Sequence, residues 1–129
     1  RFVNRQPGSG TRLFFDHLLA VHKLRPAQIK GYQQEEFTHA AVAATIASGM
    51  ADAGFGIEAA ARQHKLGFVP VAAERYFLAA RATTWTRPDA VALLAALRAG
   101  ALKTVLRDLP GYTLPPGFDL LTVRDALPE

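Results

Sequence analysis

"FVNRQPGSGTRLFFDHLL", residues Phe2–Leu19, joins a short predicted strand to a predicted helix through a turn that contains glycine. Phe2 to Arg5 is a short run that begins with apolar Phe2 and Val3, and it predicts a β-strand. A turn rich in glycine follows at Gly8–Thr11, and the apolar residues after it recur at helical spacing, which predicts a helix from Gly10 to about Lys23. A strand that enters a helix through such a turn is typical of layered α/β folds.

Helices and strands are expected to alternate in the middle of the chain. Thr38 can cap a second helix, and a short third helix is expected over Glu58–His64. Strands are predicted at Ala51–Gly56, Phe68–Val71 and Tyr76–Ala80. The predicted order, β-α-α-β-α-β-β, argues for an α/β fold with a mostly parallel sheet and helices on its faces.

The pattern changes after Thr83. Residues Thr86–Asp89 resemble a capping box with proline in the first turn, and they predict a helix that Gly100 interrupts. A second short helix is expected over Leu102–Leu109. The stretch "PGYTLPPGF" that follows is predicted to be a loop, because its prolines and glycines do not support regular structure.

Composition narrows the classes of protein that remain. The chain has 129 residues, 50% of them hydrophobic, so it can bury a core, and it lacks cysteine, which excludes a disulfide framework. No apolar run is long enough to span a membrane, so a soluble protein without membrane contact is expected. The net charge of +4 favours anionic partners, but the basic residues are scattered, and no direct nucleic acid contact is expected.

The titratable residues do not form a recognisable catalytic or metal-binding pattern. The four histidines, at positions 17, 22, 39 and 64, lack the spacing of metal ligands, so neither a metal nor a cofactor is assigned. Glu35 and Glu36 are adjacent rather than facing, and they are interpreted as a solvated pair before a helix start. No general acid/base pair emerges, and the chain is not expected to be an enzyme.

The turn before the first predicted helix is a candidate anion site. Backbone N–H groups at a helix start point outward at the positive end of the helix dipole, and Ser9 and Thr11 add hydroxyl groups. Glycine at position 10 lets the backbone approach a ligand closely. The alternative is an ordinary helix cap, and the residues of the turn alone leave both hypotheses open.

A dinucleotide site is a rival hypothesis. Gly54, Gly56 and Ala59 spell G-x-G-x-x-A between a predicted strand and helix, and Glu74 lies about twenty residues further on. Against this hypothesis, the preceding strand is short and carries Asp52 where a nucleotide-binding strand has Val or Ile. Two alternatives remain: an NAD-binding enzyme fragment and a structural docking module of a larger enzyme.

Three stretches together resemble a known family: "FVNRQPGSGTRLFFDHLL", "GYQQEEFTHAAVAATIASGMADAGFGIEAAA" and "LGFVPVAAERYFLAAR". They are similar to the periplasmic-binding-protein-like domain of molybdate-responsive regulators, which is also fused to the molybdopterin biosynthesis protein MoeA. The resemblance implies a type II fold, a three-layer αβα arrangement in two lobes. Residues 1–82 would form the second lobe and crossover strands, and residues 83–129 would help complete the first lobe. The rest of the first lobe is expected upstream of Arg1, so the chain is expected to be a truncated piece.

The resemblance also implies a set of ligand contacts. These are residues at three helix starts and two nearby arginines: Ser9, Gly10, Thr11, Thr38, His39, Gly56, Ile57, Glu58, Arg5 and Arg12. Some molybdate binders present a tyrosine hydroxyl where this chain has Ile57, and Glu58 would disfavour a divalent anion unless Arg5 or Arg12 offsets its charge.

The function implied by the resemblance is recognition without catalysis. The expected ligand is molybdate or a similar small anion or metabolite, bound in the cytoplasm. The expected partner is a domain on the same chain, either a MoeA-like molybdopterin enzyme or a DNA-binding transcription regulator.

Overall fold

The chain forms two compact units. A computed structural model describes residues 1–127, and its contacts divide the chain into a first unit, Arg1–Ala72, and a second unit that starts at Ala73. The predicted assignment of residues 1–82 and 83–129 to two lobes stays a prediction. Among the described residues, no helix has both the length and the apolar character needed to cross a membrane.

The first unit is built on a small parallel sheet. Its strands are β1 (Phe2–Arg5), β2 (Glu35–Glu36) and β3 (Ala53–Gly54), in the order β2-β1-β3, and both pairings are parallel. The central strand β1 is the one predicted from the opening stretch. This sheet and its helices confirm the predicted α/β class.

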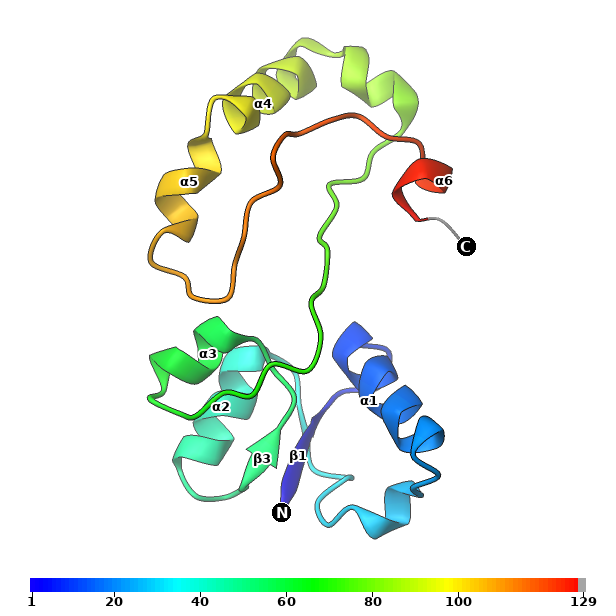
Figure 1. Ribbon diagram of the computed structural model, residues 1–129, viewed down its shortest axis with the longest axis vertical. Helices are drawn as coiled ribbons and strands as arrows, with labels where there is room; N and C mark the ends of the chain where they lie inside the picture. Colours follow the sequence, from blue (N-terminus) through cyan, green and yellow to red (C-terminus); the bar gives the residue numbers. More distant parts are fainter. Residues whose placement is uncertain (128–129) are drawn as a thin grey trace. The chain divides into compact units, whose positions relative to one another are not determined.

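Three α-helices follow the three strands in turn. They are α1 (Gly10–Val21), α2 (His39–Ala47) and α3 (Glu58–Gln63), and a short 3-10 helix at Pro26–Gln28 lies between α1 and β2. Figure 1 shows α1 on one side of β1 and β3, with α2 and α3 on the other. All three helices were predicted from the sequence to within about two residues of their ends.

Alternation along β1 supplies apolar side chains to both faces of the sheet. Val3 is fully buried and packs with Val42 of α2 and with Ala51. Its neighbour Phe2 points to the opposite face, where its ring stacks on that of Phe15 in α1 with the centroids 4.5 Å apart. One four-residue strand therefore anchors helices on both sides.

Two predicted strands are absent, and one observed strand was missed. Residues 68–71 and 76–80 form no strand, and β3 is shorter than the predicted Ala51–Gly56. A run of suitable residues becomes a strand only when a neighbouring strand accepts its backbone hydrogen bonds, and no strand of the described chain lies beside these two runs. The converse holds for Glu35–Glu36, which has a low intrinsic strand preference but pairs with the exposed edge of β1.

The regular structure in the described part of the second unit is helical. It contains a 3-10 helix at Ala82–Thr86, then α4 (Pro88–Arg98), α5 (Ala101–Leu106) and α6 (Val123–Ala126). Gly100 separates α4 from α5 with a φ of +93°, as its predicted interrupting role requires. Residues 110–118 form the predicted loop, whereas α6 was not predicted.

The predicted capping box at the start of α4 is wrong in one respect. Pro88 does occupy the first helical position, but the N-cap is Arg87, whose side chain makes no capping hydrogen bond. The hydroxyl of Thr86 instead donates to the carbonyl of Thr83, 3.0 Å away, within the preceding 3-10 helix. That local turn occupies the hydroxyl that the sequence pattern assigned to α4.

Gly54 provides a test of the packing between β3 and α2. A Cβ atom at this position would lie 2.8 Å from both the carbonyl oxygen of Val3 and Cγ1 of Val42. We expect Gly54→Ala to lower the free energy of unfolding by about 1–3 kcal/mol, because the strand and helix would have to move apart. Gly67→Ala is the matched control, since nothing lies within 4 Å of its Cβ position. Equal urea midpoints for the two variants would contradict this packing.

Candidate functional site

The starts of three helices gather at one edge of the sheet. In a parallel sheet the carboxyl ends of all strands lie at the same edge, and α1, α2 and α3 each begin within a few residues of the strand that precedes them. We call residues 5–11, 37–39 and 55–58 the carboxyl edge. The crevice outside this edge is the usual ligand position in open α/β sheets.

Ser9 closes the start of α1 as a helix cap. Its Oγ accepts a hydrogen bond from the N–H of Arg12, at 3.2 Å, so the capping role considered from the sequence is real. The N–H groups of Gly10 and Thr11 have no acceptor among residues 1–127. Because capping uses only one donor of the first turn, a capped α1 still presents two N–H groups.

The start of α2 is capped in the same way and adjoins the loop before α3. The hydroxyl of Thr38 accepts from the N–H of Ala41 at 3.0 Å. His39 is half-buried, and a Cβ placed on Gly56 would lie 3.8 Å from its Nδ1 atom. His39 and Gly56, two of the predicted site residues, are therefore neighbours although they are distant in sequence.

Arg5 connects the end of β1 with the start of α2. The residue is only 9% exposed, its Nη2 donates to the carbonyl of Phe37 at 3.0 Å, and its Nε donates to Oε1 of Gln6 at 3.2 Å. Both acceptors are neutral. No carboxylate of the described chain lies within 4.0 Å of this guanidinium, which is unusual for a buried charge.

Arg12 has a different environment, although it is equally buried. Its Nη1 donates to the carbonyl of Arg5 and to Oε1 of Glu35, both at 3.0 Å, while its Nε pairs with the Asp16 carboxylate. The guanidinium also lies 4.3 Å from the centroid of the Tyr32 ring. Burial opposes its charged form, but hydrogen bonds with Tyr32, Glu35 and Asp16 and the negative charge of Asp16 together outweigh burial, so the pKa of Arg12 is raised. Arg12 thus joins α1 to the sheet.

The residues at the start of α3 include a paired carboxylate. Ile57 is the N-cap of α3 and makes no side-chain capping bond. Glu58 accepts from Nε and Nη2 of Arg62, each at 3.2 Å, one turn further along the helix. The charge of Glu58 is therefore partly balanced within α3.

Several residues that matter for the arrangement were not identified from the sequence. The prediction that Glu35 and Glu36 form a solvated pair is wrong. Glu35 binds Arg12, and Glu36 accepts a 2.9 Å hydrogen bond from Thr45. The partners are up to 23 residues apart, and no local spacing indicates such a pairing. Contact of the ten predicted residues with a ligand stays a prediction.

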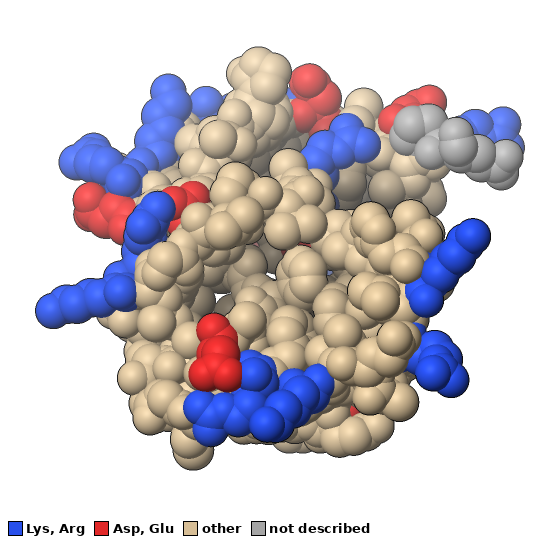
Figure 2. Space-filling view, turned by 60° about the horizontal axis from the view of Figure 1, so that its bottom comes forward, with Lys and Arg blue, Asp and Glu red and all other residues tan. Residues whose placement is uncertain are grey.

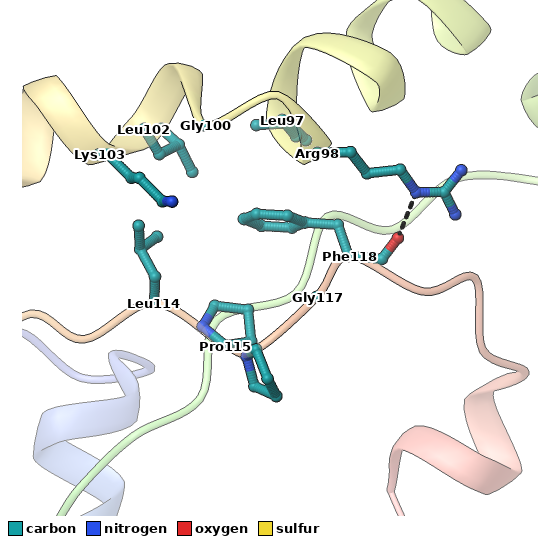
Figure 3. A pocket seen from close by; sticks show the side chains of 10 residues that line it. Leu97, Arg98, Gly100, Leu102, Lys103, Leu114, Pro115, Gly117 and Phe118 are labelled. Carbon is teal, nitrogen blue, oxygen red and sulfur yellow. Dashed lines mark hydrogen bonds between the residues drawn. The ribbon is translucent and has the colours of Figure 1, made fainter.

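Hollows in the second unit are bounded by apolar and charged side chains together. The pocket in Figure 3 has a volume of about 140 Å³ and lies between the α4–α5 junction and the loop that carries Phe118. Nε of Arg98 donates to the Phe118 carbonyl at 3.0 Å, which ties the loop to α4. Its charged lining residues are Arg98 and Lys103, beside apolar Leu97, Leu102 and Phe118.

The charges of the chain do not single out another site. Figure 2 shows Lys and Arg in separate groups on the face that it draws, several of them beside Asp or Glu. Within residues 1–127, no three His, Asp or Glu side chains come close enough to hold a metal ion together. The absence of direct nucleic acid contact stays a prediction.

Comparison with known proteins defines the class. A model of the PBP superfamily domain, the periplasmic-binding-protein superfamily, matches residues 1–98, and the chain belongs to this family. The uncharacterized protein YvgK of Bacillus subtilis (strain 168) is 38% identical over 76 residues, which are 59% of this chain and 25% of YvgK. The chain therefore spans about a quarter of YvgK.

A second relative is matched over nearly its whole length. An uncharacterized protein in the 5' region of the ferredoxin 2Fe-2S gene of Clostridium pasteurianum is 33% identical over 111 residues, or 85% of this chain and 98% of that protein. No solved structure matches the chain.

The difference between Arg12 and the exposed arginines can be measured. We expect Arg12→Lys to lower the free energy of unfolding by about 1–3 kcal/mol, because an ammonium group cannot reproduce the planar contacts with Glu35, Asp16 and the Arg5 carbonyl at once. The matched control is Arg62→Lys, whose parent side chain is 54% exposed in its ion pair, and a change below about 0.5 kcal/mol is expected. Urea unfolding measures the stability of both variants, and equal losses in the free energy of unfolding would contradict the assigned role of Arg12.

Proposed function

We propose that the first unit is a non-catalytic ligand-binding module and that its carboxyl edge binds a small anion or an anionic metabolite. Membership of the PBP superfamily supports a ligand-binding role. The observation that carries the proposal is that α1 and α2, both long enough to present a helix dipole, begin at the same edge of the parallel sheet, where buried Arg5 donates to the Phe37 carbonyl just before α2.

The proposed binding mode relies mainly on the backbone. The N–H groups of Gly10 and Thr11 point outward from the first turn of α1, and the hydroxyl of Thr11 adds a donor beside them. Thr38 and His39 begin α2, which contributes its own first-turn donors. Such an arrangement recognises an anion by charge and by oxygen position rather than by one particular side chain.

The finer parts of the proposal follow the family resemblance. We propose a type II arrangement in which this unit is the second of two lobes and the ligand is molybdate or a related small anion or metabolite. The module would act in the cytoplasm as a sensor for a partner domain on the same chain, either a MoeA-like enzyme or a DNA-binding regulator. The two relatives are uncharacterized, so the support for this part is the resemblance alone.

The dinucleotide hypothesis receives no support from the packing. Gly54 has a structural reason to be glycine, because a side chain there would collide with Val3 and Val42. The helix after the glycines, α3, has only six residues, so it offers a short dipole for a pyrophosphate. The anion hypothesis uses α1 and α2, which have 12 and nine residues.

A titration followed by amide NMR tests the proposed site. We expect molybdate, tungstate or sulfate to shift the amide signals of Gly10, Thr11 and His39 with millimolar affinity, because one lobe supplies only part of the anion's hydrogen bonds. Thr11→Val should weaken binding by about 2- to 10-fold, the value of one neutral hydrogen bond. Thr104→Val, on exposed α5, is the matched control and should bind like the parent chain. Shifts confined to the second unit would contradict the proposed function.

A further inference from the structure

We propose that the pocket between α4, α5 and the loop of residues 114–118 is a binding site for a short aliphatic carboxylate, with Lys103 as its charged contact. The pocket belongs to the second unit, and most of its lining residues follow residue 98, where the match to the superfamily domain ends. It shares no residue with the carboxyl edge, so the inference does not depend on the ligand proposed there.

Half-buried apolar side chains form most of the pocket wall. Leu97 comes from α4, Leu102 from α5, and Leu114 and Phe118 from the loop. The volume of about 140 Å³ is close to that of a protein cavity that holds benzene. The pocket therefore has room for a hydrocarbon chain of a few carbon atoms.

The Gly100 junction leaves room for Lys103 to reach the pocket. Gly100 has a φ of +93°, and a Cβ atom placed on it would lie 3.3 Å from Cδ of Lys103. Figure 3 shows the Lys103 amino group pointing toward Leu114 and Phe118. Within residues 1–127 no carboxylate forms an ion pair with this ammonium group. Its charge therefore lies beside apolar walls without a counterion.

Arg98, the other cation of the lining, holds the loop in place. Its Nε donates to the Phe118 carbonyl at 3.0 Å, and in Figure 3 its guanidinium extends away from Lys103. The nearest acidic neighbour of the loop is Asp119, whose Oδ2 would lie 3.7 Å from a Cβ atom on Gly117, but Asp119 does not line the pocket. The lining thus contains two cations and no carboxylate.

A carboxylate with a short apolar chain uses both features of the pocket. Its charged oxygens would accept a charge-assisted hydrogen bond from Lys103, while its carbon chain would cover the leucine and phenylalanine side chains. A neutral alcohol would leave the ammonium group without a counterion, and an inorganic anion would leave the apolar walls in contact with water. A few polar groups within apolar walls are the usual composition of a small-molecule site.

Ligands with the same chain and different head groups separate the two contributions. Butyrate, butanol and butylammonium are each titrated at pH 7 and constant ionic strength into the full chain, followed by the amide signals of Leu102, Lys103 and Phe118. We expect butyrate to bind with millimolar affinity, about tenfold or more above that of the other two. Equal binding of butyrate and butanol would overturn the inference, as would the absence of saturable shifts.

Acetate tests the contribution of the apolar walls. It should bind about tenfold more weakly than butyrate, the value of two buried methylene groups. Equal affinities would overturn the inference, because they would show a surface cation that attracts any anion. Butyrate shifts confined to Gly10, Thr11 and His39 would also overturn it, and they would support the anion site at the carboxyl edge.

Substitution of Lys103 tests the charged contact itself. Lys103 is exposed, so Lys103→Gln should keep the fold, weaken butyrate binding by about tenfold and leave butanol binding unchanged. Arg107→Gln is the matched control, since it removes one positive charge from the exposed C-cap of α5 and does not line the pocket. Its butyrate affinity should match that of the parent chain. Unchanged butyrate affinity in Lys103→Gln, or an equal loss in the two variants, would overturn the assignment of Lys103.

Discussion

Pairing of β1 on both of its edges is the constraint on which the first unit depends. The N–H groups of Phe2 and Asn4 donate to the carbonyls of Lys30 and Gln34 at 2.7 and 2.8 Å, which fixes the segment after α1 against one edge. On the other edge, the carbonyl of Arg1 accepts from Asp52 N–H at 2.8 Å. Because a central strand satisfies its backbone only when both neighbours are present, these three segments order together.

Two buried arginines of this unit differ in their hydrogen-bond partners. Arg12 donates hydrogen bonds to Glu35, Asp16 and the backbone of β1, and these bonds hold α1 against the sheet. Arg5 lies at the end of the strand with neutral acceptors. Since both charges are buried, the difference lies in their carboxylate partners: Arg12 forms ion pairs with Asp16 and Glu35, whereas Arg5 forms none in the described chain.

Sequence reasoning predicted the parts of the fold that depend on local signals. The strand Phe2–Arg5, the capped helices after Ser9 and Thr38, and the break at Gly100 all follow from spacing, capping and glycine chemistry, and all are present. The short strand Glu35–Glu36 does not follow from such signals, because it exists only through its partner β1. For the same reason the apolar runs at 68–71 and 76–80, which have suitable residues, form no strand.

The candidate site, too, could be predicted from the sequence only where local signals define it. Helix starts are local, so Gly10, Thr11, Thr38 and His39 could be placed at helix N-termini from the sequence, and the parallel sheet brings those termini to one edge. Which arginine keeps an uncompensated charge depends on the position of Glu35, which is 23 residues from Arg12 and reaches it only through the β1–β2 ladder. The sequence alone therefore does not distinguish the two arginines, while the register of one short strand pairing brings Glu35 to Arg12, and no carboxylate of the described chain forms an ion pair with Arg5.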